Sequence, residues 1–99
     1  FAQAEIALNE ALDVYPEDLG FLYHRAEMRL ELGKYEQALE DYNLVIARAG
    51  QEAFLQDALY SRGAARYKLG QENEAEADRL KAQSLTQDTL QAYTVYFQE

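Results

Sequence analysis

The sequence predicts an all-α chain of antiparallel helix pairs with about six helices, and three observations support this prediction. Helix-favouring Ala, Leu, Glu and Gln dominate the 99 residues, which include a single proline. Glycines separate stretches whose apolar residues recur at helical spacing. A helix–turn–helix pattern with a Leu-Gly pair at its turn also occurs twice, at Leu32-Gly33 and Leu69-Gly70.

The first half of the chain is predicted to hold three helices. The first covers about 2–14 and ends before Pro16, because the residue that precedes a proline is disfavoured in a helix. The next two, near 19–32 and 35–48, flank Gly33, and Gly50 closes this pair. We expect Gly33 to be the residue after the helix end, in the left-handed conformation that glycine adopts at little cost.

The second half is predicted to hold a further pair and one terminal helix. The pair flanks Gly70, near 53–69 and 71–85. The terminal helix covers 89–98, with Asp88 as its N-cap and Gln91 three residues on. Its apolar residues are spaced three and four apart, which favours a capping helix packed on the preceding pair. The alternative is an exposed β-like run over 93–97.

Internal repetition is the strongest pattern in the chain. One set of residues recurs after 34 positions: Ala4, Leu8, Ala11 and Leu12 as Ala38, Tyr42, Val45 and Ile46. Another recurs after 37 positions: Leu22, Tyr23, Arg25, Ala26, Leu32, Gly33 and Ala38 as Leu59, Tyr60, Arg62, Gly63, Leu69, Gly70 and Ala75. A helix–turn–helix period of about 34 residues with small residues between the helices resembles the tetratricopeptide repeat.

The middle unit carries the resemblance most specifically. It has Leu22 where the family prefers Trp, the small Ala26, the turn Gly33, the aromatic Tyr35, and Ala38 four residues before Tyr42. The resemblance implies an α-solenoid in one domain over 1–99. Its parts are the second helix of a truncated repeat (1–16), a complete repeat (17–50), a degraded repeat (51–87) and a capping helix (88–99). The third part is degraded because Glu72 and Arg79 replace its expected aromatic residues.

Composition excludes several function classes. The formal net charge of −9 argues against nucleic acid and anionic membranes, because phosphate groups attract positive surfaces. No apolar run reaches the length that membrane insertion needs. The acidity favours simple solubility, or adaptation to high salt, over steering of basic partners. Without cysteine there is no disulfide or thiolate site, and the compartment stays open, with the cytoplasm favoured.

No motif in the sequence favours an enzyme. His24 is the only histidine, and a single histidine cannot supply the several ligands or the oriented base that metal and catalytic sites require. We therefore predict no catalytic residue, no metal site and no cofactor.

Four arginines form a candidate anion seam. Arg25 and Arg29 are four residues apart and share one helix face, and Arg62 with Arg66 repeats that pair. Their guanidinium groups could bind a carboxylate or phosphate in bidentate geometry. The favoured alternative is structural pairing with acids of neighbouring helices, namely Glu40, Asp41, Glu76 or Asp78.

The resemblance also implies a concave groove lined by the first helix of each unit, which takes protein or peptide ligands. Carried onto this sequence, the groove residues are Tyr23, Glu27, Leu30, Tyr60, Ala64, Tyr67 and Lys68. Tyrosines suit protein recognition because each combines apolar area with a polar tip. The alternative is that they pack between neighbouring units. The basic clamp with which some members bind chaperone tails has no counterpart here.

We therefore predict a non-enzymatic scaffold that binds protein or peptide. The alternative is a structural spacer or self-association segment of a larger repeat protein. As the second helix of a truncated repeat, the first helix is expected to need a partner, and Phe1, Ala4 and Leu8 are expected to leave an apolar face open. Either upstream repeats cover that face in a longer protein, or the fragment forms a homodimer through its N-terminal helix.

Overall fold

The computed structural model describes residues 1–50 and 54–97, with their side chains as far as Leu85. These ranges are helical, contain no strand, and form five helices: α1 (Ala2–Val14), α2 (Leu19–Glu31), α3 (Tyr35–Ala49), α4 (Phe54–Lys68) and α5 (Glu72–Phe97). The limits of α1 to α4 lie within a residue or two of those predicted, so the local stop signals in the sequence were sufficient for them.

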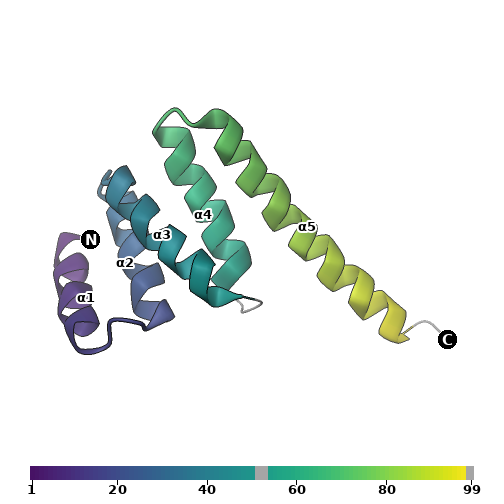
Figure 1. The fold of residues 1–99 in the computed structure, drawn as a ribbon, viewed down its shortest axis with the longest axis horizontal. Helices are drawn as coiled ribbons and strands as arrows, with labels where there is room; N and C mark the ends of the chain where they lie inside the picture. The colour runs from purple at the N-terminus through teal and green to yellow at the C-terminus, as the bar shows by residue number, and fades with distance from the viewer. Residues whose placement is uncertain (51–53, 98–99) are drawn as a thin grey trace.

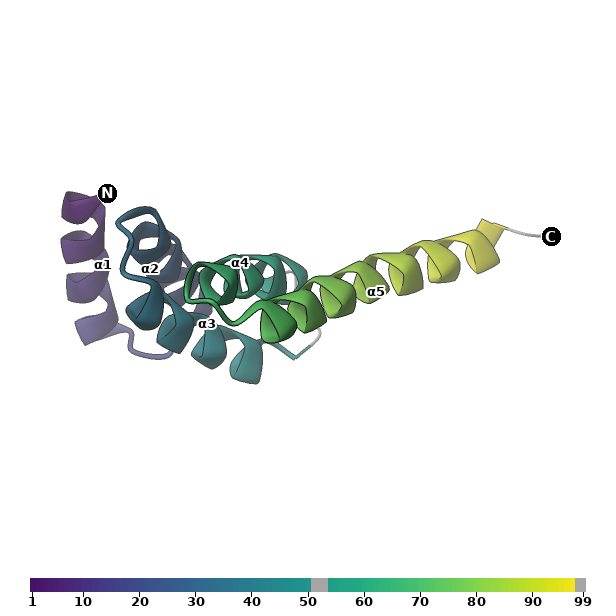
Figure 2. The same cartoon turned by 90° about the horizontal axis from the view of Figure 1, so that it is seen from above.

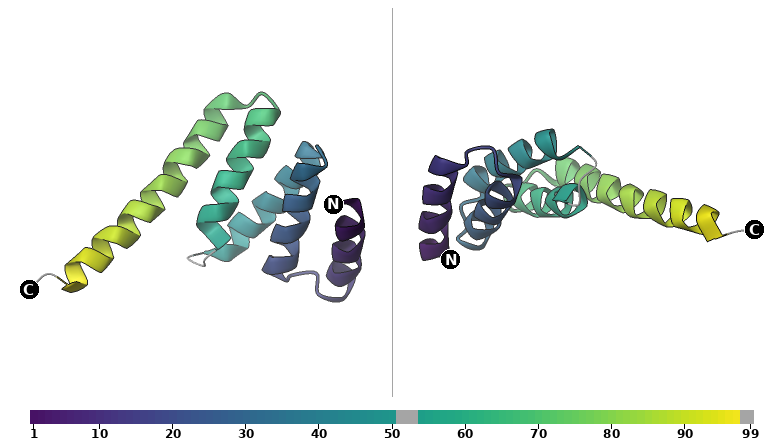
Figure 3. Two further views of the ribbon diagram at one scale, coloured as in Figure 1. Left: turned by 180° about the vertical axis from the view of Figure 1, so that it is seen from behind. Right: turned by 90° about the horizontal axis from the view of Figure 1, so that it is seen from below.

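The helices stack in chain order, and each packs against the next (Figure 1). α3 packs against both α2 and α4, and α2 also touches α4 directly. The molecule is elongated, with extents of 52 × 33 × 20 Å, and the far end of α5 projects away from the other helices (Figure 2). Seen from behind and from below, α1 and the far end of α5 lie at opposite ends of the molecule (Figure 3).

The predicted sixth helix is wrong, because α5 continues without a break through 86–88 to Phe97. No glycine or proline occurs after Gly70, so nothing in this stretch stops a helix that has already formed. Asp88 therefore lies within α5 and is not an N-cap, and the alternative of a β-like run over 93–97 is wrong as well. How the side chains of this stretch pack lies outside the described residues.

The turns after α2 and α4 share one glycine geometry. Gly33 has a φ of +77°, its amide donates to the Leu30 carbonyl (3.1 Å), and the amide of Lys34 donates to the Arg29 carbonyl (2.8 Å). These two bonds satisfy carbonyls at the helix end, as in a Schellman motif. The turn at Gly70, with a φ of +82°, repeats both bonds. The prediction for Gly33 is confirmed, and the two turns are equivalent.

Small residues allow α2, α3 and α4 to approach closely. Ala26, Ala38, Ala58 and Ala65 are fully buried in one cluster. Gly63 continues this pattern between α4 and α5, because a Cβ there would lie 3.2 Å from the Ala75 carbonyl oxygen. The repeated small positions therefore mark the contact surfaces of successive helices.

Larger side chains fill the space around these small residues. Tyr42 is completely buried, together with Val45, and Leu22 is nearly so. The ring of Tyr23 lies between those of Tyr42 and Phe54, at centroid distances of 6.3 and 5.7 Å. This aromatic cluster connects α2, α3 and α4 into one core.

Candidate functional site

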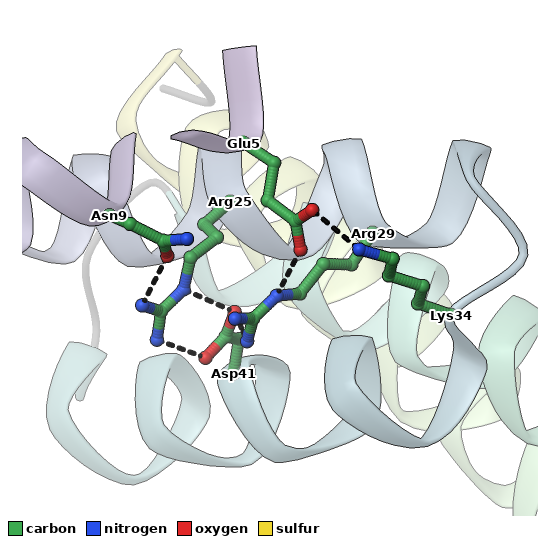
Figure 4. A network of polar contacts seen from close by, with 6 residues as sticks. All are labelled: Glu5, Asn9, Arg25, Arg29, Lys34 and Asp41. Atoms are coloured by element: carbon green, nitrogen blue, oxygen red, sulfur yellow. Dashed lines mark hydrogen bonds and ion pairs between the residues drawn. The ribbon is translucent and has the colours of Figure 1, made fainter. Parts of the chain in front are cut away.

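The first two arginines of the predicted seam share one buried carboxylate (Figure 4). Arg25 on α2 donates from Nε to Asp41 Oδ2 (2.9 Å) and from Nη2 to Asp41 Oδ1 (2.8 Å). Arg29, one turn later, donates from Nη1 to Asp41 Oδ2 (3.0 Å). Asp41 on α3 is only 2% exposed, so its charge depends on these partners. The pairing with Asp41 also raises the pKa of Arg25, which stays charged.

The second pair repeats this arrangement between α4 and α5. Arg62 donates from Nε and Nη2 to the two oxygens of Asp78 (2.9 and 2.6 Å), and Arg66 donates from Nη1 to Asp78 Oδ2 (3.0 Å). All three residues stand 37 positions after their counterparts. The predicted pairing with Asp41 and Asp78 is thus present, and any anion in this seam would have to compete with two buried carboxylates.

Glu5 also belongs to the first network, although it was not among the acids predicted to pair with the arginines. This α1 residue is buried, and it accepts from Lys34 Nζ (2.7 Å) and Arg29 Nε (2.9 Å). These hydrogen bonds, that from Lys34 foremost, hold the pKa of the Glu5 carboxyl below its usual value. Asn9, one turn later on α1, accepts from Arg25 Nη1 (3.0 Å). The available signal was that Glu5 directly follows Ala4, a core position of the repeat.

The second network lacks this outer carboxylate. After the 34-residue and 37-residue shifts, Leu39 takes the place of Glu5 and Gln71 that of Lys34. Asn43 keeps the role of Asn9 and accepts from Arg62 Nη1 (3.1 Å). Arg66 Nε is buried and, without this carboxylate, has no hydrogen-bond partner among the described residues. The two networks therefore differ only at their outer edge.

Three of the predicted groove residues lie within the packing of α2, α3 and α4. Tyr23 is half-buried between two aromatic rings, Leu30 packs on the core, and Glu27 accepts a hydrogen bond from the hydroxyl of Tyr42. Burial raises the pKa of Tyr42 and of Tyr23. For this unit, the packing interpretation of the tyrosines agrees with the observed contacts.

The other four predicted residues are exposed on α4. Tyr60 and Tyr67 are 44% and 63% exposed, and both line a hollow of about 540 Å³ between α4 and α5, together with Ala64. Gly63 and Ala75 are buried at its base, and Glu72, Glu76 and Arg79 of α5 complete the lining. Lys68 does not line this hollow. We call these eight lining residues the α4–α5 hollow.

The charged side of the α4–α5 hollow contains an exposed ion pair. Arg79 Nε donates to Glu76 Oε2 (2.9 Å), within one helix turn. This hydrogen bond lowers the pKa of Glu76 and raises that of Arg79. Both side chains are more than half exposed, so solvent screens the pair and it adds little to stability. Glu76 can therefore exchange Arg79 for another cation at small cost.

The described residues form neither a metal-binding group nor a membrane-spanning helix. Among them, no group of three or more His, Asp or Glu side chains could hold a metal ion. None of the helices in the described part is long and apolar enough to cross a bilayer. His24 is exposed beside the Tyr23 ring, at a centroid distance of 5.8 Å.

A scan against protein-family models and a search of curated proteins found no match to this chain. Any assignment of function therefore depends on the geometry of the helices and on the pattern of the sequence.

Proposed function

We propose that this chain is a protein-binding module, built as a segment of an α-solenoid of tetratricopeptide type. Two features support the solenoid: the Schellman turns at Gly33 and Gly70 have the same hydrogen bonds, and the Asp41 and Asp78 networks recur at the same spacing. A unit whose turns and contacts between helices both repeat is typical of such arrays. Neither feature needs a catalytic group.

The α4–α5 hollow is the observation that carries the binding proposal. It combines two exposed tyrosines and a small-residue base with charged groups at one side. Concave surfaces with rigid aromatic side chains and a few polar groups suit the recognition of a partner protein. The chain binds through this hollow, and Tyr23, Glu27 and Leu30 contribute by holding α2, α3 and α4 in place.

A second candidate function is supported by the apolar residues that stay exposed in and next to α1. Phe1 and Ile6 are 67% and 58% exposed, whereas Ala4 and Leu8 are partly covered. An apolar surface at the end of a stack favours contact with a further helix, from upstream repeats or from another copy. In this alternative the chain is a spacer or self-association segment of a larger protein.

Selection from a displayed peptide library tests the binding proposal. Peptides selected on the wild-type chain should lose binding to Ala64→Arg, because this exposed position lines the α4–α5 hollow. The matched control is Ala47→Arg, a change at an exposed alanine of α3 outside the hollow. Equal loss in both variants, or selection of no peptide at all, would favour the spacer.

A further inference from the structure

The internal repeat allows the α4–α5 hollow to be compared with the equivalent surface of the preceding unit. Resting on the proposed function, we propose that the hollow takes an α-helix of another protein. This helix has an apolar face that combines an aromatic residue with small residues, and an arginine in its last turn that pairs with Glu76.

The hollow corresponds to a surface that is already covered by a helix in the preceding unit. Its residues Tyr60, Gly63, Tyr67 and Ala75 stand 37 positions after Tyr23, Ala26, Leu30 and Ala38. Of these earlier residues, Tyr23 packs on Phe54 of α4, and all four belong to or pack against the core cluster that includes Ala58 and Ala65 of α4. α4 packs on both α2 and α3. Each helix pair thus presents a surface shaped for one more helix, and in the last pair the described residues leave it open.

The face with which α4 covers the earlier surface defines what the hollow can accept. Phe54 packs on Tyr23, while Ala58 and Ala65 are fully buried in the shared core cluster. These three residues are four and seven positions apart, which is one face of a helix. An extended peptide would turn alternate side chains away from the surface and could not reproduce this contact. The geometry therefore favours a helix as the ligand.

Glu76 adds a charge requirement to this shape. It stands 71 residues after Glu5, the 34-residue shift followed by the 37-residue one. Glu5 on α1 receives Nε of Arg29, which lies in the last turn of the helix packed against α1. If a partner helix packs on α5 in the way that α2 packs on α1, an arginine in the last turn of that helix meets Glu76. The only ion pair that Glu76 makes within the described residues is the exposed one with Arg79.

Charge also distinguishes the partner from a second copy of this chain. The lining of the hollow carries Glu72 and Glu76 against Arg79, and the whole chain has a net charge of −9. The helix with an open apolar face, α1, contains no basic residue and would bring Glu10 and Asp13 to these acids. Such an approach is repulsive, whereas a basic helix is attracted.

A synthetic peptide with the sequence of residues 54–71, FLQDALYSRGAARYKLGQ, is the probe. It carries the face of α4 that covers the earlier surface, and Arg66 in its last turn. Titrated into the intact chain, it should gain helical circular dichroism and shift the ring signals of Tyr60 and Tyr67. Arg66→Met in the peptide, or Glu76→Arg in the protein, should each weaken binding about tenfold.

The decisive measurement is the charge exchange between protein and peptide. Glu76→Arg in the protein together with Arg66→Glu in the peptide should restore most of the lost affinity, as a double-mutant cycle for a direct contact requires. The control Glu74→Arg makes the same charge change on α5 outside the hollow and should leave binding within about twofold of wild type, because long-range charge effects are screened.

Several outcomes overturn this inference and leave the proposed function separately testable. Absence of peptide binding at millimolar concentration, or equal weakening by Glu74→Arg and Glu76→Arg, excludes the basic helix. Equal binding of a probe with Ala58→Pro, which cannot form the full helix, indicates an extended ligand. Self-association of the chain that Ala64→Arg abolishes indicates a second copy. In contrast, the binding function itself fails when the library gives no peptide, or when the selected peptides do not depend on Ala64.

Discussion

The Asp41 and Asp78 networks share a centre, which is an aspartate with two arginines, and differ in the outer residues around it. In both, one buried aspartate holds two arginines of the preceding helix. Around Asp41, α1 adds Glu5, and the turn adds Lys34, so Arg29 Nε is satisfied. Around Asp78, Arg66 Nε stays buried without a partner among the described residues. The central contacts lie within each helix pair, whereas the outer carboxylate of the first network comes from the helix that precedes the pair and its lysine from the turn.

This difference shows how a repeat can vary without losing its fold. A buried ion pair depends on having its hydrogen bonds satisfied, so the shared aspartate is constrained by both arginines. The outer position is under a weaker constraint, and it changes from Glu5 to Leu39 to Glu76 along the chain. The aspartate with its two arginines therefore recurs unchanged in both pairs, whereas the outer residue decides whether Nε of the second arginine has a partner.

The largest effect is expected at the centre of a network. Asp41→Ala leaves Arg25 and Arg29 without their shared carboxylate and should lower the free energy of unfolding by about 3 kcal/mol. Urea unfolding followed by circular dichroism measures this loss. Asp78→Ala should act similarly on the second pair. A loss below about 1 kcal/mol for both variants would mean that solvent already screens these arginines.

The turn glycines should give the next largest effect. Gly33→Val places a β-branched residue at a φ of +77° and should cost about 1–2 kcal/mol, and the equivalent Gly70→Val should cost about as much. An added Cβ at either site meets no atom within 4 Å, so backbone strain, and no clash at Cβ, is the cause of the expected loss. A melting temperature within a degree of wild type for either variant would contradict the claim that its turn needs glycine.

Introducing the outer glutamate and lysine of the first network at the equivalent positions of the second should stabilise the second network. Leu39→Glu with Gln71→Lys recreates the Glu5–Lys34 arrangement beside Arg66 and should raise the free energy of unfolding by about 1 kcal/mol, because the buried Nε gains an acceptor. Gln71→Lys alone, which keeps Leu39, is the control without the new acceptor. Equal stability of the two variants would show that water already satisfies Arg66.

The smallest effect should appear in the pH dependence of the Asp41 network. Because the pKa of Glu5 is lowered by folding, the stability it contributes is present above the unfolded value of about 4.5 and is lost as the pH falls through the folded value. Glu5→Gln should therefore lower stability at pH 7 and change it little at low pH. Unfolding curves at both pH values measure this, and a loss that does not depend on pH would assign the role of Glu5 to packing.

The sequence by itself determined the elements whose causes are local. Glycine conformation and the restriction before Pro16 placed the ends of α1 to α4, and the spacing of Arg25 and Arg62 revealed the repeated pairing. The absence of any stop signal after Gly70 was equally local, and an N-cap preference at Asp88 was too weak to interrupt a helix that had already formed.

Tertiary structure decided the features that depend on residues far apart in the chain. Glu5 and Arg29 are 24 residues apart, so no local pattern shows that they meet. The sequence also could not distinguish the predicted groove residues of the two units, because they occupy equivalent positions of the repeat. Tyr23 lies under α4, while its counterpart Tyr60 lies in the open hollow. Periodicity places a side chain on a helix face, but only the packing of the next helix determines whether that face is covered.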